Sequence, residues 1–133
     1  MTTRETILAA FAKQLAAVAS GRVYRTRRDQ LPDLPAVIIE PESATTSEIV
    51  LGAMDHELAV SVAIYAKGGT PDNAADATLL AAHAAVIIDR SLGLGNGVQV
   101  RPEFEAEWNF DDYDYVKAIH HYHVTYRTTG NDF

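Results

Sequence analysis

Apolar side chains recur at steps of three and four residues in two parts of the chain, which is the spacing of one face of an α-helix. In residues 4–19 they form a single stripe made of Ile7, Leu8, Phe11, Leu15 and Val18. Thr2 and Glu5 fit a capping box before this stripe, and Gly21 fits a left-handed cap after it. A second helix is predicted from Thr70 to about Leu92, because Thr-Pro-Asp is a typical helix start and a broad apolar face follows it.

Other parts of the chain alternate between apolar and polar side chains, which predicts β-strands. Residues 36–40 are rich in β-branched side chains and predict one strand. Residues 98–110 predict an edge or bulged strand, since Pro102 interrupts them, and residues 116–128 predict the last strand. The clearest strand covers residues 57–67, where the large side chains of one face are Leu58, Val60, Val62 and Ile64.

The order of these elements predicts an α+β fold, a small mainly antiparallel β-sheet with two α-helices packed on one face. The polar run at about residues 42–56 is expected to be either a long hairpin arm or a loop that moves. A chain of 133 residues has the length of one domain and buries enough surface to fold without disulfides. We therefore expect a single domain over residues 1–133.

Composition and charge restrict the possible partners. Apolar residues make up 47% of the chain and charged residues 22%, a balance typical of globular proteins. The net charge of −7 argues against non-specific binding to duplex DNA, which depends on lysine and arginine at the phosphates. With no cysteine there is no disulfide or thiolate site. No apolar run is long enough to span a bilayer, so we expect a cytoplasmic protein without a membrane partner.

The densest group of possible metal ligands lies in the last predicted strand. His121 and His123 project from the same strand face, where two imidazoles could bind a transition metal. A third ligand would have to come from another strand, for example Glu105 or Glu107. The alternative is a polar strand face turned to solvent or to an interface. We favour this alternative, because the same alternation places Thr125 beside the histidines and the tyrosines opposite them, and we predict no bound metal.

Three other sequence patterns each lack a feature that a binding or catalytic site of that type requires. The acidic turn made by Asp111, Asp112 and Asp114 has neither the central glycine nor the closing glutamate of a calcium loop. The glycines of residues 93–97 follow a helix, whereas phosphate-binding loops precede one. No serine lies in a Gly-x-Ser-x-Gly elbow. We therefore expect no catalytic residues, no enzyme activity and no cofactor.

One basic cluster stands out in this acidic chain, and it contains Arg22, Arg25, Arg27 and Arg28. One interpretation is a solvated loop. The other is a contact with acidic side chains of an adjacent subunit, for which the candidates are Glu42, Glu48, Asp111, Asp112 and Asp114. Opposite charges on unlike surfaces favour head-to-tail association into a closed ring.

Four stretches of the sequence stand out by their order and spacing: LPAVIIE at residues 34–40, DHELAVSV at 55–62 with TPD at 70–72, EWNFDDYD at 107–114, and VTYR at 124–127. Taken together, they resemble the tail terminator (minor tail protein U-like) family of long-tailed bacteriophages. None of them is a catalytic signature, and the resemblance covers nearly the whole chain.

The resemblance implies a structural protein that forms a homo-hexameric ring at the head-proximal end of a phage or prophage tail. Such a ring ends polymerisation of the tail tube and provides the surface to which the head docks. The implied partners are further copies of the chain, the tail-tube protein and the head–tail connector proteins, while DNA passes through without specific binding. The implied location is the host cytoplasm during assembly and then the virion tail.

Three alternatives remain open. The chain could be another component of the phage neck, such as a head-closure or tail-completion protein. It could be a small metal-dependent enzyme or sensor that uses His121 and His123. Last, it could be a bacterial binding module that buries an acidic ligand between its helices and its sheet.

Overall fold

The computed structural model describes residues 2–25, 35–50, 52–67, 71–95, 97–112 and 115–129. Its helices are α1 (Thr3–Gln14), the short 3-10 helix η1 (Val18–Gly21) and α2 (Pro71–Ile87). Its strands are β1 (Val23–Tyr24), β2 (Ala36–Val50), β3 (Ala53–Lys67), β4 (Gln99–Asp112) and β5 (Tyr115–Thr129).

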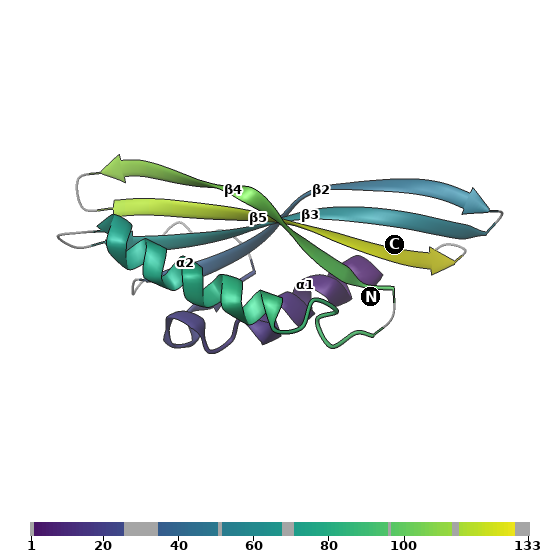
Figure 1. Cartoon of the computed structure of the whole chain (residues 1–133), viewed down its shortest axis with the longest axis horizontal. Coiled ribbons are helices and arrows are strands. Elements are labelled where there is room, and N and C mark those ends of the chain that lie inside the picture. The colour runs from purple at the N-terminus through teal and green to yellow at the C-terminus, as the bar shows by residue number, and fades with distance from the viewer. Residues whose placement is uncertain are drawn as a thin grey trace.

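The strands form one five-stranded sheet in the order β1-β2-β3-β5-β4. Only the short β1 runs parallel to its neighbour, and the other pairings are antiparallel. Both α1 and α2 lie on the same side of this sheet (Figure 1). The predicted α+β fold, with two helices on one face of a mainly antiparallel sheet, is therefore confirmed. Neither of the described α-helices is long and apolar enough to cross a membrane.

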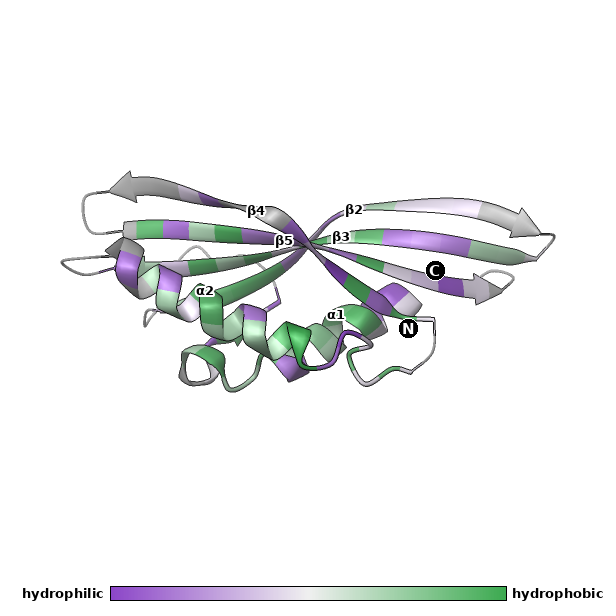
Figure 2. Ribbon diagram, viewed as in Figure 1, coloured by the Kyte–Doolittle hydropathy of each residue, from purple (hydrophilic) through white to green (hydrophobic). Residues whose placement is uncertain are grey.

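The core lies between the helices and the inner face of the sheet. Along β3 the predicted large side chains are at most 1% exposed, and they pair across the ladder with inner-face residues of β5. Figure 2 shows the alternation of hydrophobic and hydrophilic residues along β5, and it shows that both helices carry residues of both kinds. The largest side chains of this core include Ile7, Phe11, Leu15, Ile39, Leu58, Ile64, Val86 and Tyr122.

Helix α1 begins as expected but ends earlier than predicted. The Thr2 hydroxyl accepts a hydrogen bond from the Glu5 amide at 3.1 Å, which confirms the cap. The helix stops at Gln14 rather than Ala19, since Leu15 has a non-helical ψ of 1° and the Ala16 amide donates to the Lys13 carbonyl at 3.3 Å, as in a 3-10 turn. The apolar period nevertheless continues, because the turn and the 3-10 helix that follow still bury Leu15 and Val18.

Helix α2 also ends before its predicted boundary, at Ile87 instead of Leu92. The Asp89 carboxylate accepts hydrogen bonds from the amides of Ser91 at 3.0 Å and Gly93 at 2.9 Å. Such local side-chain bonds compete with helical ones and close a turn instead. The Gln14 amide then ties α1 to this end of α2 by donating to the Ala85 carbonyl at 2.8 Å and to the Asp89 carbonyl at 2.9 Å.

The segment from 42 to 56 forms the outer half of the β2–β3 hairpin. Its pairing continues from Ala36–Tyr65 to Val50–Ala53, with a bulge between Pro41 and Ser43. β5 runs beside β3 along the whole of this arm (Figure 1). At the other edge, β4 loses its regular register between Pro102 and Ala106, which confirms the predicted irregular edge strand.

We predict that Phe11→Ala destabilises the protein by about 3–5 kcal/mol, because it empties a fully buried site beside the Tyr122 ring, 5.9 Å away between centroids. Urea unfolding measures the change. Lys13→Ala, at an exposed position of the same helix, should stay within about 0.5 kcal/mol of the parent. Equal effects of the two substitutions would contradict the placement of α1.

Candidate functional site

The outer face of the sheet, opposite the helices, carries His121, His123 and Thr125, which the sequence singled out. Lys117 and Arg127 of β5 lie on the same face, and these side chains alternate with ones that are buried on the inner face. The predicted separation of the two histidines from the tyrosines is thus confirmed.

His121 lies between two carboxylates from different strands. Its Nδ1 is 2.7 Å from Oε1 of Glu42 on β2, and its Nε2 is 3.5 Å from Oε2 of Glu107 on β4. β2 is not a neighbour of β5, so Glu42 has to cross β3. The small Ser61, which pairs with His121 on β3, leaves room for this contact, and the β2 bulge lies at Glu42.

His123 is placed in the same way one step further along β5. Its Nδ1 is 2.9 Å from Oε1 of Glu57 on β3, and its Nε2 makes a short contact with Oε1 of Glu103 on β4. The four carboxylates and two imidazoles therefore connect β2, β3, β5 and β4 across one face. Partly exposed ion pairs of this kind each stabilise a fold by about 0–1 kcal/mol.

These contacts bear on the possible metal site. Among the residues that the structure describes, no group of three or more histidine, aspartate and glutamate side chains is arranged to hold a metal ion. Glu107, one of the two possible third ligands, lies beside His121, with its Oε2 3.5 Å from Nε2 of the imidazole. The side chain of Glu105, the other one, lies outside the described part of the chain.

The structure describes only some of the charged side chains that the sequence predicted at a subunit interface. Arg25 binds Glu5 of the same chain through two hydrogen bonds of 2.9 and 3.0 Å, and this bond and the positive charge lower the pKa of Glu5. Glu42 faces His121. The positions of Arg27, Arg28 and Asp114, and the side chains of Glu48, Asp111 and Asp112, lie outside what the structure describes.

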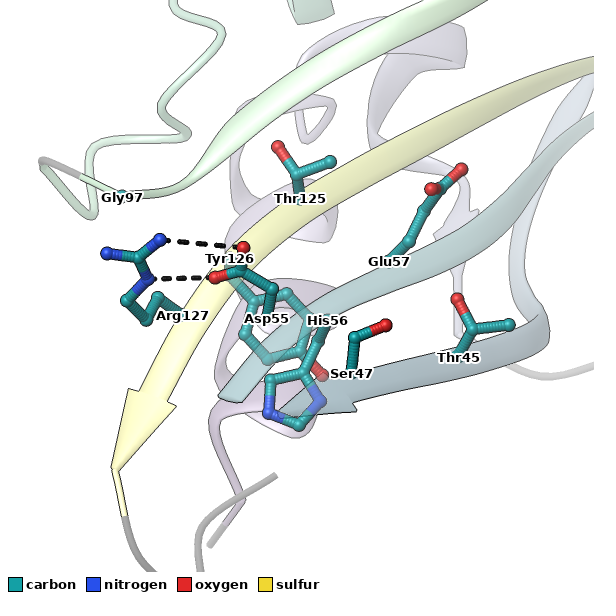
Figure 3. Close-up of a pocket in the computed structure, with 9 residues that line it drawn as sticks. All are labelled: Thr45, Ser47, Asp55, His56, Glu57, Gly97, Thr125, Tyr126 and Arg127. Atoms are coloured by element: carbon teal, nitrogen blue, oxygen red, sulfur yellow. Dashed lines mark hydrogen bonds and ion pairs between the residues drawn. The ribbon is translucent and has the colours of Figure 1, made fainter. Parts of the chain in front are cut away.

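A second polar cluster lines a cleft of about 430 Å³ on the hairpin arm (Figure 3). In it the Arg127 guanidinium donates to the Asp55 carboxylate at 2.8 and 3.5 Å, and this bond is the main cause that lowers the pKa of Asp55. The lining residues are Thr45, Ser47, Asp55, His56, Glu57, Gly97, Thr125, Tyr126 and Arg127. Sequence reasoning did not find this cluster, which depends on the pairing of strands far apart in the chain.

His56 belongs to this cluster but points to the inner face, where it is 3% exposed. Its Nδ1 lies 2.9 Å from the Thr46 hydroxyl and its Nε2 lies 2.7 Å from the Thr128 hydroxyl. Its ring stacks on Tyr126 with centroids 4.7 Å apart. Both ring nitrogens thus have hydroxyl partners, as a buried imidazole requires, and the arrangement is that of a structural side chain.

A chain of hydrogen bonds crosses the inner face from α2 to β4. Nε2 of His120 donates to the Glu103 carbonyl at 2.8 Å, so in the neutral ring Nδ1 accepts from the Tyr122 hydroxyl at 3.2 Å. The Tyr122 oxygen is then free to accept from Nδ1 of His83 at 2.9 Å. Burial raises the pKa of Tyr122, which keeps the hydroxyl protonated.

His83 is the member of this chain whose pKa is lowered. Burial is the main cause that lowers its pKa, and the positive charges of His120 and Arg90 lower it further. The arrangement fixes the irregular part of β4 from the helix side, while the Glu103 side chain is held by His123 on the other face. On both faces, most of the polar side chains described here pair with one another, and those of the hairpin arm line the cleft of Figure 3.

No model of a protein family matches the sequence, and no curated protein matches it. Among solved structures, the chain is similar to a chain of the "Virion of native gene transfer agent (GTA) particle". The TM-score is 0.67 and the identity 20%, over 92% of this chain and 95% of that one. This likeness shows that the two chains share a fold, and it spans nearly all of both.

We predict that His83 makes the protein less stable in mild acid. Its pKa in the folded protein is below the unfolded value of about 6.5, so below that pH the unfolded chain binds a proton that the folded chain does not. Urea unfolding at pH 7.5 and 5.5 measures the loss. In His83→Asn, which keeps a donor for Tyr122, the loss should be smaller; an unchanged loss would show that His83 does not contribute.

We also predict that each arginine acts on its own carboxylate. In Arg127→Gln the pKa of Asp55 should rise towards its ordinary value while that of Glu5 stays low, and Arg25→Gln should do the reverse. Carboxyl carbon chemical shifts followed by NMR over pH 2–6 report both groups. A pKa of Asp55 that ignores Arg127 would contradict the contact in Figure 3.

Proposed function

We propose that this chain is a structural protein of a phage or prophage particle that assembles into a ring at the head-proximal end of the tail. There it ends polymerisation of the tail tube and offers the surface to which the head docks. The observation that carries the proposal is the fold shared with a gene transfer agent virion chain over nearly the whole length of both chains. The resemblance of the sequence to tail terminators supports the specific role.

The polar side chains support a protein that works through its surfaces. In the described part of the chain, histidines face glutamates and arginines bind carboxylates, as at His121 with Glu42 and Arg127 with Asp55. Catalytic sites usually place ionisable groups in a cleft with strongly shifted pKa values. The buried Tyr122 and His83 do have shifted values, but they bond to each other under α2. We therefore propose no enzyme activity.

In this proposal each copy binds the next one by a head-to-tail contact. The ring closes when the rotations between neighbouring copies add up to a full turn. The basic cluster around Arg25, Arg27 and Arg28 is one side of this contact. The other side comes from the acidic residues Glu42, Glu48, Asp111, Asp112 and Asp114 of the neighbour. The family resemblance implies six copies in the ring, with the tube and connector proteins as partners.

The outer face of the sheet suits the wall of a channel for DNA. It carries Glu42, Glu57, Glu103 and Glu107 over three strands. A surface of this charge repels phosphates, so DNA slides past without specific binding. The helices then face away from the channel, because they cover the opposite side of the sheet (Figure 1).

Deletion of the gene from the genome that encodes the particle tests the role. We expect electron micrographs of lysates to show tails of uncontrolled length and heads without attached tails, because nothing stops the tube or docks the head. A copy of the gene supplied on a plasmid should restore the normal length. Tails of normal length beside empty or leaking heads would contradict the terminator and identify a head-closure protein instead.

A further inference from the structure

Two arginines line a cleft of about 420 Å³ at the edge of the sheet that β4 forms. Arg90 lies in the turn that follows α2, and Arg101 lies near the start of β4. Both are exposed, and neither has a hydrogen bond or an ion pair with any residue that the structure describes. Arg25 and Arg127, by contrast, each bind a carboxylate of the same chain. Two available guanidinium groups in one cleft can bind an anion from outside the chain.

Backbone hydrogen bonds hold the two arginines beside each other. The Val100 amide donates to the Arg90 carbonyl at 2.9 Å, so the turn after α2 is joined to the residue that precedes Arg101. The Asp89 carboxylate closes the same turn by accepting from two further backbone amides. Because the backbone on both sides of the cleft is already ordered, only the two side chains have to be immobilised when a ligand binds, which lowers the entropic cost of binding.

The other residues that line the cleft are Glu57, Pro102 and His123. Arg101 pairs with His123 in the ladder between β4 and β5. Nδ1 of His123 lies 2.9 Å from Oε1 of Glu57, and its Nε2 contacts Oε1 of Glu103. Both carboxylates therefore face the imidazole, and neither forms an ion pair with the arginines. Their charges weaken the binding of an anion, but they leave both guanidinium groups available for direct contact.

We propose that Arg90 and Arg101 together bind a phosphate group. Guanidinium forks match the oxygens of both carboxylates and phosphates. A carboxylate has two oxygens, which one fork occupies, whereas a phosphate has further oxygens for a second fork and carries more charge. Two charge-assisted contacts opposed by nearby carboxylates predict a dissociation constant on the order of a millimolar. The site belongs to the single chain, so it does not depend on the proposed function.

An NMR titration of the full chain with inorganic phosphate at constant ionic strength tests the site. The Nε–H signals of Arg90 and Arg101 should move and saturate, and those of Arg25 and Arg127 should not. Arg90→Gln and Arg101→Gln should each weaken binding about tenfold, because each removes a charge-assisted contact. The control Lys13→Gln, which removes one positive charge at an exposed position of α1, should leave the dissociation constant unchanged. Equal weakening in all three variants, or signals that never saturate, would overturn the proposal.

Acetate and a short DNA duplex identify the chemistry and the source of the ligand. Acetate should bind more weakly than phosphate, because it occupies only one fork; equally tight binding of acetate would show that the cleft selects a carboxylate and that the proposal is wrong. If duplex DNA moves the same two signals, the result supports a backbone phosphate, which arginines contact without reading the base sequence. Movement with inorganic phosphate but not with DNA supports a free phosphate.

Discussion

The pairing of β3 with β5 is the interaction on which the rest of the structure depends. These two strands lie at the centre of the sheet and remain in register from Ala53–Thr129 to Lys67–Tyr115. Their inner side chains form the floor on which α2 packs, while α1 lies mainly against β2. Each large apolar side chain buried there stabilises the fold by about 1.5–3 kcal/mol. A slip by one residue would turn every inner side chain outwards, so burial fixes the register.

The same register determines which side chains lie on the outer face of the sheet, opposite the helices. Because the inner positions are taken up mainly by the core, His121 and His123 of β5 and the glutamates of the neighbouring strands lie on the outer face. The two faces of the sheet therefore differ: one packs against the helices, and the other carries paired histidine, glutamate and arginine side chains.

Much of the fold could be predicted from sequence because it depends on local periods. The alternation around Val60 and the helical spacing around Phe11 are visible within a dozen residues. The helix ends were predicted too late, because the tight turn after Gln14 and the Asp89 turn depend on local bonds that the apolar period does not report. The apolar period correctly predicted that Leu15 is buried, although Leu15 lies just beyond the end of α1.

The candidate sites were less accessible to sequence reasoning. That His121 and His123 share a face follows from alternation, but their partners do not. Glu42 reaches His121 only because of a bulge and a small residue on the strand between them, and His83 joins Tyr122 only through the packing of α2. Such contacts join residues about 40 to 80 positions apart, so they require the register of the whole sheet.

Cryo-electron microscopy of the tail ends of particles that contain this protein tests most directly the proposal that it acts through its surfaces once it is assembled. The expected density at the head-proximal end is a closed ring of copies, with the histidine and glutamate face of the sheet lining a channel wide enough for duplex DNA and the helices on the outside. Isolated copies, an open filament, or helices lining the channel would contradict it.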